Sequence, residues 1–225
     1  MNGIWAAVPV KEFAGAKQRL SPLLTPDQRQ TLAAAMLEDV LEALAAAPLA
    51  GVMVNTLDPT AQALARRYGA RVVTEGARTG HTGAVAAMAR ILAAGGAAGM
   101  LTCPGDIPRI TAAEIAAVLA AHGPAPAFTI VPAHDGRGSN AVLVSPPDAV
   151  ALSFGDDSFL PHLETARRAG LEPIVLHLPG IGLDIDNPED ARAFLDAMPE
   201  RETRASVVLR RMLTTPLPLA GEVGE

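Results

Sequence analysis

Two carboxylates placed two residues apart are the clearest sign of chemistry in the chain. Asp184 and Asp186 lie in the segment Gly-Leu-Asp-Ile-Asp-Asn-Pro at 182–188. In an extended segment, side chains two residues apart point to the same side. Their like charges repel each other, and a bound cation keeps both ionised. The pair therefore predicts a metal site, with plain surface residues as the alternative.

A third carboxylate follows a short apolar run at 99–103. Asp106 lies in the sequence Cys-Pro-Gly-Asp-Ile-Pro (103–108), where two prolines and a glycine make a rigid turn. A hard divalent cation prefers such carboxylate oxygens. Asp106 is therefore a candidate metal ligand, and the alternative is an Asp that only caps the turn before Thr111.

A basic loop follows the first apolar run, residues 4–10. It contains Lys11, Gly15, Lys17 and Arg19. Backbone N–H groups and cations in a loop between a strand and a helix are suited to binding phosphates. The spacing of a P-loop, GxxxxGK followed by Ser or Thr, is absent. The loop indicates phosphate binding, and a solvated basic loop is the alternative.

Three more polar segments each have more than one interpretation. Ser139 and Asn140, in the Gly-Arg-Gly-Ser-Asn segment at 136–140, belong to a hairpin turn or bind a phosphate or carboxylate. Ser158, after Gly155, is a helix N-cap or part of an anion site. His81 contacts a base, carries a proton or is merely structural.

The elements that position these residues alternate along the chain. Thr25 and Thr111 each open a helix with a capping box. The alternation of strands and helices predicts an α/β protein, a single αβα sandwich around a mostly parallel sheet. In such sheets ligands bind beyond the carboxyl ends of the strands. The expected strands are 4–10, 52–56, 71–74, 99–103, 128–131, 141–144 and 173–176, and the expected helices are 26–47, 60–68, 82–92, 111–123, 158–169 and 188–198.

Length and composition favour one domain. The 225 residues, 49% of them apolar, can bury one sizeable core. We expect this domain to cover 1–200. Residues 201–225 end in sequence rich in Pro, Gly and Glu, so we expect an extension outside the core.

Charge and composition exclude several classes of partner. A net charge of −6 and an aromatic share of 3% argue against nucleic-acid binding. Cys103 is the single cysteine, which excludes an internal disulfide and fits a reducing compartment. Apolar runs fall short of the ~18–20 residues of a membrane span. We expect a cytoplasmic protein whose oligomeric state stays open, a homodimer included.

Taken together, the polar segments resemble the CofC/FbiD family of guanylyltransferases, within the wider MobA-like nucleotidyltransferases. They run in the order of the family over about 5–198. The matching pieces are Val-Pro-Val-Lys (8–11), Lys-Gln-Arg-Leu (17–20), Pro-Gly-Asp-Ile-Pro (104–108), Gly-Ser-Asn-Ala (138–141), Phe-Gly-Asp-Asp-Ser-Phe with His162 (154–159), and Leu-Asp-Ile-Asp-Asn-Pro-Glu-Asp (183–190).

This resemblance implies a nucleotidyltransferase fold of the GT-A-like, Rossmann-like type. It also implies an enzyme that joins GMP from GTP to a three-carbon phosphorylated acid and releases pyrophosphate, in the biosynthesis of coenzyme F-420. The acceptor is phosphoenolpyruvate, 2-phospho-L-lactate or 3-phospho-D-glycerate. The family often has Gly-Leu-Asn where this chain has Gly-His-Thr at 80–82.

The resemblance also implies roles for individual residues. Mg²⁺ would be bound by Asp106, Asp184 and Asp186, with Lys17 and Asp106 as catalytic residues. The acceptor would be bound by Ser139, Gly155 and Ser158. The residues implied for the nucleotide are Lys11, Lys17, Arg19, Gly80 and Thr82.

The expected reaction is an in-line attack by an acceptor phosphate oxygen on the α-phosphorus of GTP. A phosphate is already ionised at neutral pH, so positioning and charge neutralisation replace a strong general base. Two alternatives stay open. One is a molybdopterin or sugar-phosphate nucleotidyltransferase of the same fold, and the other is a non-catalytic nucleotide-binding module.

Overall fold

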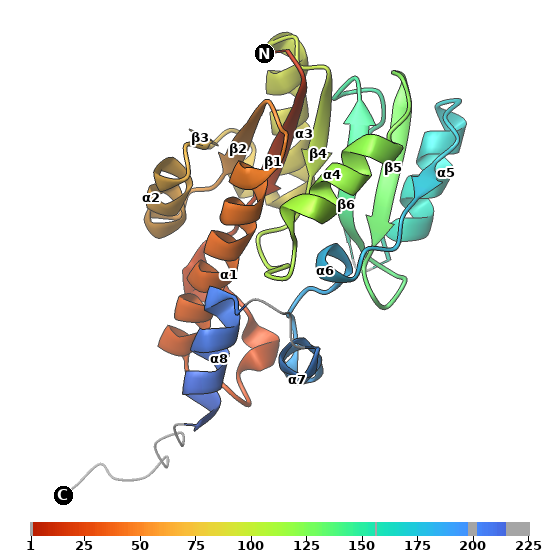
Figure 1. Ribbon diagram of the computed structural model, residues 1–225. Coiled ribbons are helices and arrows are strands. Elements are labelled where there is room, and N and C mark those ends of the chain that lie inside the picture. The colour runs from red at the N-terminus through yellow and green to blue at the C-terminus, as the bar shows by residue number, and fades with distance from the viewer. Residues whose placement is uncertain (1, 156, 198–201, 215–225) are drawn as a thin grey trace, which may run out of the picture.

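The computed structural model describes residues 2–155, 157–197 and 202–214 (Figure 1). Its strands are β1 (Ile4–Pro9), β2 (Gly51–Asn55), β3 (Arg71–Val73), β4 (Gly99–Thr102), β5 (Ala127–Pro132), β6 (Ser139–Ser145) and β7 (Ile174–Val175). Its α-helices are α1 (Pro26–Ala46), α2 (Pro59–Arg67), α3 (Gly80–Ala94), α4 (Ala112–Ala121), α5 (Phe159–Arg168), α6 (Pro179–Gly182), α7 (Pro188–Asp196) and α8 (Arg204–Thr214). Short 3-10 turns are η1 (Phe13–Gly15), η2 (Gln18–Leu20) and η3 (Ala77–Thr79).

The strands form one sheet in the order β3-β2-β1-β4-β6-β5-β7. β6 pairs antiparallel with both β4 and β5, and the other strand pairs are parallel. The sheet is therefore mostly parallel, and every strand and helix expected from the sequence is present near its predicted bounds. The predicted fold class is confirmed.

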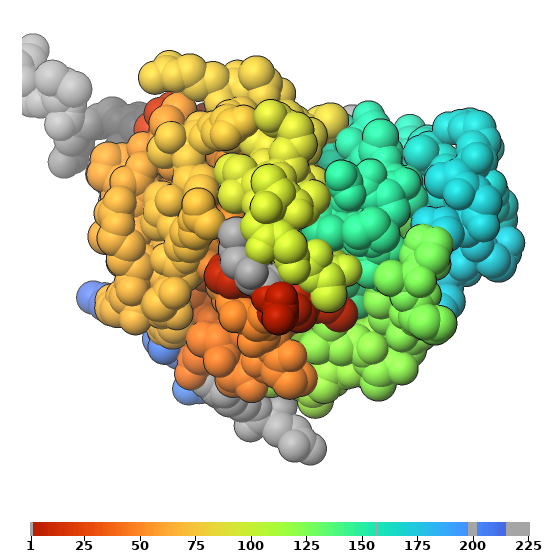
Figure 2. All heavy atoms as spheres, turned by 90° about the horizontal axis from the view of Figure 1, so that it is seen from above, coloured from red at the N-terminus to blue at the C-terminus, as the bar shows by residue number. Residues whose placement is uncertain are grey.

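Helices cover both faces of the sheet. On one face, buried side chains of α1, α4, α7 and α8 pack with the strands in one large apolar cluster. On the other face α3 packs against β1, β2 and β4, and α5 packs against β5 and β6. Figure 2 views the end of the molecule where β1 begins, with segments of the two helical layers on either side of it. Because both faces are covered, β4 and β6 are buried along their whole length.

The helix starts follow the predicted capping chemistry. The Thr25 hydroxyl accepts a hydrogen bond from the N–H of Gln28, whose side chain accepts one from the N–H of Thr25. The same reciprocal pair of bonds joins Thr111 and Glu114. These boxes satisfy backbone donors that the first turn of a helix leaves unpaired. They fix where α1 and α4 begin, and so where the preceding loops must end.

The prediction that the chain after residue 200 lies outside the core is wrong for α8. Ala205 and Leu209, one helical turn apart, are fully buried in the cluster that α1 also joins. The Asp39 carboxylate of α1 accepts hydrogen bonds from the backbone N–H groups of Arg204 and Ala205, both at 2.9 Å. α8 lies beside α1 in Figure 1. Residues 215–225, whose composition suggested the extension, lie outside the described residues.

Within the described residues, none of the helices combines the length and the apolar character needed to cross a bilayer.

Candidate active site

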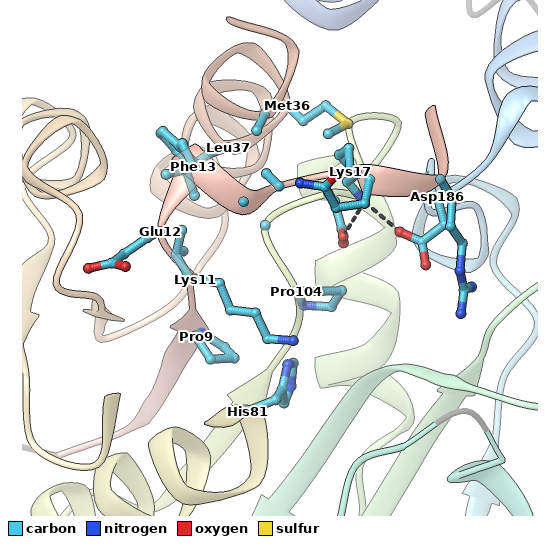
Figure 3. Close-up of a pocket in the computed structure, with 18 residues that line it drawn as sticks. Pro9, Lys11, Glu12, Phe13, Lys17, Met36, Leu37, His81, Pro104 and Asp186 are labelled. Atoms are coloured by element: carbon cyan, nitrogen blue, oxygen red, sulfur yellow. Dashed lines mark hydrogen bonds and ion pairs between the residues drawn. The ribbon is translucent and has the colours of Figure 1, made fainter. Parts of the chain in front are cut away.

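A cleft of about 630 Å³ lies at the carboxyl ends of the central strands. Its walls are the loop after β1, the loop after β4, one side of α1 and the side chains of His81 and Asp186 (Figure 3). Its size lies in the range of ~300–1,000 Å³ of small-molecule and cofactor sites. The cleft therefore has the place and the size that a bound nucleotide requires in this architecture.

A buried cation bridges two of the predicted carboxylates in this cleft. Lys17 Nζ lies 2.6 Å from Asp106 Oδ2 and 2.6 Å from Asp186 Oδ1. The Lys17 side chain is 8% exposed, whereas those of Asp106 and Asp186 are 30% and 44% exposed. We call these three residues the charged cluster (Figure 3). The carboxylates keep open sides toward the cleft while the ammonium is enclosed.

Lys17 adopts an unusual backbone conformation to reach this place. Its φ of 54° makes it the non-glycine residue with positive φ in the described part of the chain. A side chain in the left-handed region costs roughly 1–2 kcal/mol. Lys17 stands directly before η2, and its carbonyl accepts the N–H of Leu20 at 2.9 Å. The two ion pairs and this turn hold the strained residue in place.

The charges of this cluster stabilise one another. Burial acts to lower the pKa of Lys17, but Asp106 and Asp186 outweigh it, so the pKa is raised and the side chain stays cationic. Burial acts to raise the pKa of Asp186, but Lys17 outweighs it, together with Arg19 and Lys11, and the pKa is lowered. Lys17 and Asp186 are therefore both ionised at neutral pH.

Asp184 is held apart from Lys17 by another partner. Asn140 Nδ2 donates to Asp184 Oδ1 at 3.1 Å and to the carbonyls of Ile181 and Gly182 at 3.1 and 3.0 Å. Burial, and after it the charge of Asp106, raise the pKa of Asp184. Within the part of the chain that the structure describes, no three His, Cys, Asp or Glu side chains are grouped to hold a metal ion. The three predicted ligands are therefore not arranged as a metal site here: Lys17 Nζ lies between Asp106 and Asp186, and Asp184 accepts from Asn140.

The start of α3 contributes a neutral imidazole to the cleft. Burial lowers the pKa of His81 to about 4, Lys11 adds to this, and Asp106 opposes it. The Lys11 side chain extends toward His81 (Figure 3). Gly80, with a φ of 79°, lines a small adjoining pocket with His81. The hydroxyl of Thr82 accepts the N–H of Phe154 at 2.9 Å, so it holds the neighbouring loop.

Ser139 and Ser158 meet in a second group, centred on a buried histidine. Ser139 Oγ lies 2.9 Å from His162 Nδ1 and 3.3 Å from Ser158 Oγ. Ser139 is the first residue of β6, directly after the turn of the β5–β6 hairpin. Ser158 precedes α5, but its side chain makes no capping bond. We call Ser139, Ser158 and His162 the neutral cluster.

The structure therefore divides the predicted site residues into two groups. Lys11, Lys17, Arg19, Asp106 and Asp186 line the cleft. The predicted residues that do not line it are Gly80, Thr82, Ser139, Gly155, Ser158 and Asp184, of which Gly80 lines the small adjoining pocket.

His162 had no predicted role, and Asn140, expected like Ser139 to contact a ligand phosphate or carboxylate, has protein partners instead. Asn140 follows Ser139 in the chain and binds Asp184. His162 lies four residues after Ser158, which is the spacing of one helix face, and that spacing was the available signal.

The comparisons with known proteins decide the family. The protein-family model described as "Guanylyl transferase CofC like" matches residues 4–214 of this chain. This chain belongs to that family. The match includes α8, which agrees with its packing against α1.

Three relatives of known name fit this family. The chain is similar to the phosphoenolpyruvate guanylyltransferase of Rubrobacter xylanophilus, with 40% identity over 83% of this chain and 91% of that protein. It is 33% identical to the 2-phospho-L-lactate guanylyltransferase of Methanothermobacter thermautotrophicus, over 96% of this chain and 94% of that protein. It is also 33% identical to the 3-phospho-D-glycerate guanylyltransferase of Colwellia psychrerythraea, over 81% and 87%.

A solved structure supports the fold. The chain superimposes on a protein of Desulfovibrio desulfuricans, assigned as a nucleotide-diphospho-sugar transferase, with a TM-score of 0.68 over 95% of this chain and 96% of that one. At 19% identity this likeness concerns the architecture. With the family match, it makes the chain a nucleotidyltransferase of the guanylyltransferase class.

Proposed function

We propose that this enzyme transfers GMP from GTP to a three-carbon phosphorylated acid and releases pyrophosphate, and that phosphoenolpyruvate is its acceptor. The observation that carries this proposal is the charged cluster at the base of the cleft. The support for the acceptor is the relative with 40% identity, which is named for phosphoenolpyruvate. Such a product is an intermediate of the type that coenzyme F-420 biosynthesis uses.

The residues of the cleft suit a triphosphate. Lys11, Lys17 and Arg19 bring three positive charges to one side of it. Transfer of a nucleotidyl group gathers negative charge on the phosphate oxygens, and fixed cations stabilise that charge. The acceptor phosphate is ionised at neutral pH and attacks the α-phosphorus without a strong base. His81 is therefore not needed as a base. As a neutral ring it has one donor and one acceptor nitrogen for hydrogen bonds.

Magnesium is the metal that we propose for this site, because a hard divalent cation prefers carboxylate oxygens, although the three carboxylates are not grouped around one point in the described part of the chain. Asp106 and Asp186 already flank a cation, Lys17 Nζ, at 2.6 Å each, and both keep exposed oxygens. Asp184 lies close enough for the charge of Asp106 to raise its pKa, and a divalent cation would reverse that shift. When bound, Mg²⁺ supplies neutralisation of the triphosphate charge. Asp106, Asp184 and Asp186 would hold it, and Lys17 has phosphate oxygens as its alternative partners.

The acceptor is proposed to bind at the neutral cluster. Ser139 offers its hydroxyl proton to a phosphate or carboxylate, Ser158 Oγ lies beside it at 3.3 Å, and the exposed Gly155 precedes Ser158 by three residues. Asn140 joins β6 to Asp184, and so ties this cluster to the acidic end of the cleft. We also propose a cytoplasmic location, since GTP and phosphorylated acids are cytoplasmic metabolites.

The test is pyrophosphate release from GTP and Mg²⁺, with each of the three acids supplied in turn and with ATP and CTP as control nucleotides. The proposal predicts release with GTP and phosphoenolpyruvate. Pyrophosphate release with only one of the other two acids would show that the proposed acceptor is wrong and the proposed reaction is right. GTP binding without release for any acid would support the non-catalytic module instead.

A further inference from the structure

The neutral cluster has a fixed direction of hydrogen bonding, set by a backbone group. His162 Nε2 lies 3.1 Å from the backbone N–H of Ser153. A backbone N–H can only donate, so Nε2 must be the ring nitrogen without a proton. In a neutral imidazole the proton then sits on Nδ1, which faces Ser139 Oγ at 2.9 Å. His162 therefore donates to Ser139.

The surroundings of His162 keep the ring in this state. Its side chain is 1% exposed. Burial, and after it repulsion from His81 when that ring is protonated, lower the pKa of His162 to about 4, so the ring stays neutral at neutral pH. Phe154 packs edge-on against it with ring centroids 4.9 Å apart at 69°, which restricts rotation of the imidazole. Both the tautomer and the orientation of the ring are thus determined by its neighbours.

This arrangement determines what the Ser139 hydroxyl can do. A hydroxyl has one proton and two acceptor positions. Ser139 Oγ accepts from His162 Nδ1 at 2.9 Å and from the Ser158 hydroxyl at 3.3 Å, so both acceptor positions are used. Its own proton is left for a third partner outside the cluster. Ser139 is thus a hydrogen-bond donor, the character that an anionic oxygen requires.

The same tautomer excludes a nucleophilic serine. A histidine that activates a serine must accept the proton of the hydroxyl. His162 Nδ1 already carries a proton, and Nε2 is occupied by Ser153. The pair of Ser139 and His162 is therefore suited to binding and not to covalent catalysis.

We propose that His162 is a positioning residue, which through Nδ1–H turns the Ser139 hydroxyl toward an anionic oxygen of the acceptor acid. The identity of the ligand rests on the proposed function, whereas the direction of the hydrogen bonds rests on the structure alone. The charged cluster plays no part in this arrangement, so His162 acts on the acceptor and leaves the nucleotide unaffected.

Two conservative variants separate positioning from packing. The amide of His162→Asn lies near the place of Nδ1 and can still donate to Ser139. The amide of His162→Gln reaches the place of Nε2 and can keep only the bond from Ser153. Asparagine is the smaller residue and leaves the larger cavity. If His162 only filled space, His162→Asn would therefore raise the KM for the acceptor more than His162→Gln.

The proposal predicts the opposite order. His162→Gln raises the KM for the acceptor about 10-fold, the effect of one lost hydrogen bond to a charged group, and His162→Asn raises it by a factor of about 3 or less. The KM for GTP stays near the wild-type value in both. Ser139→Ala removes the oriented hydroxyl and keeps His162, so it should raise the acceptor KM as much as His162→Gln does. It tests the same hydrogen bond if the glutamine variant does not fold.

A second readout does not depend on activity. Nitrogen NMR of histidine-labelled wild-type protein, with His162 assigned from the His162→Asn spectrum, gives the tautomer at neutral pH. The proposal predicts a neutral ring with the proton on Nδ1, and a proton on Nε2 or an imidazolium would overturn it. Equal acceptor KM values in an active enzyme for His162→Gln and His162→Asn would also overturn it. A wild-type enzyme that turns over no acid but has the Nδ1–H tautomer would refute the proposed function and support the inferred direction of hydrogen bonding.

Discussion

The charged cluster of Lys17, Asp106 and Asp186 is assembled from segments far apart in the chain, whereas the neutral cluster comes from one hairpin and the helix that follows. Lys17 meets its partners across 89 and 169 residues. Ser139 meets His162 and Ser158 across 23 and 19. The charged cluster borders the cleft with partly exposed carboxylates, and all members of the neutral cluster are buried.

The difference indicates two ways of preparing a site. In the charged cluster the proposed function requires an exchange of partners: Lys17 would turn from its carboxylates to phosphate oxygens, and the partly exposed carboxylates would bind the metal ion. In the neutral cluster the donors are arranged before any ligand binds, which reduces the cost of ordering them on binding. Variants in the first should therefore affect mainly turnover, and variants in the second mainly acceptor affinity.

The largest effect is expected for Asp106. Asp106→Asn removes a charge from the proposed metal site and one partner of Lys17, and we expect kcat/KM to fall by about 1,000-fold. The melting temperature should change little, because the side chain stays partly exposed. Asp148→Asn, an exposed carboxylate away from the cleft, is the matched control and should keep wild-type kinetics. Equal activity of both variants would contradict the role of the charged cluster.

Asp184 tests the metal more specifically. Asp184→Asn keeps an oxygen to accept the Asn140 amide but removes the charge. We expect turnover to fall by about 100-fold and the Mg²⁺ concentration for half-maximal rate to rise, because a hard cation binds a neutral amide oxygen more weakly. Kinetics at varied Mg²⁺ measure both. Near-normal turnover would show that Asp184 is not a ligand.

The neutral cluster should respond through affinity. Ser158→Ala removes the weaker of the two bonds to Ser139, at 3.3 Å, and leaves the donor from His162 in place. We expect the acceptor KM to rise by a factor of about 3, less than the effect of Ser139→Ala, with kcat unchanged. Initial rates at varied acceptor give the values. A larger rise in the acceptor KM for Ser158→Ala than for Ser139→Ala would contradict the inferred direction of hydrogen bonding.

The smallest effect concerns stability against acid. The pKa of His162 falls from 6.5 to about 4 on folding, so between these values the unfolded chain binds more protons than the folded one. Its contribution to the free energy of unfolding is complete above 6.5 and is lost as the pH falls toward 4. His81 shifts in the same direction. Urea midpoints across this range should fall less steeply for His162→Asn than for the wild type.

How much of this site follows from sequence depends on how local each signal is. The capping box at Thr25 and the apolar alternation are local, and they predicted α1 and the sheet. Asp106 and Asp186 were recognised because polar residues that follow strands gather at one edge of a parallel sheet. The spacing of residues does not show that Lys17 lies between them, since that depends on two tertiary contacts and a left-handed backbone.

Other features of the site have a simpler local explanation in the sequence, or no local signal at all. Ser158 has the position of an N-cap, and only the structure shows its hydroxyl turned to Ser139. His162 belongs to a segment that resembles the family, but its tautomer is not visible in the sequence, because it is set by the backbone N–H of Ser153. α8 was missed because its apolar face, with Ala205 and Leu209, precedes a stretch that contains several Pro, Gly and Glu residues.

The most direct test of the account is phosphorus NMR of GTP, Mg²⁺ and phosphoenolpyruvate incubated with wild-type enzyme and with Asp106→Asn. The account predicts a new diphosphate linkage between GMP and the acid, together with pyrophosphate, in the wild-type reaction and almost none in the variant. Absence of that linkage with each of the three acids, in a folded protein, would contradict guanylyl transfer to such an acid.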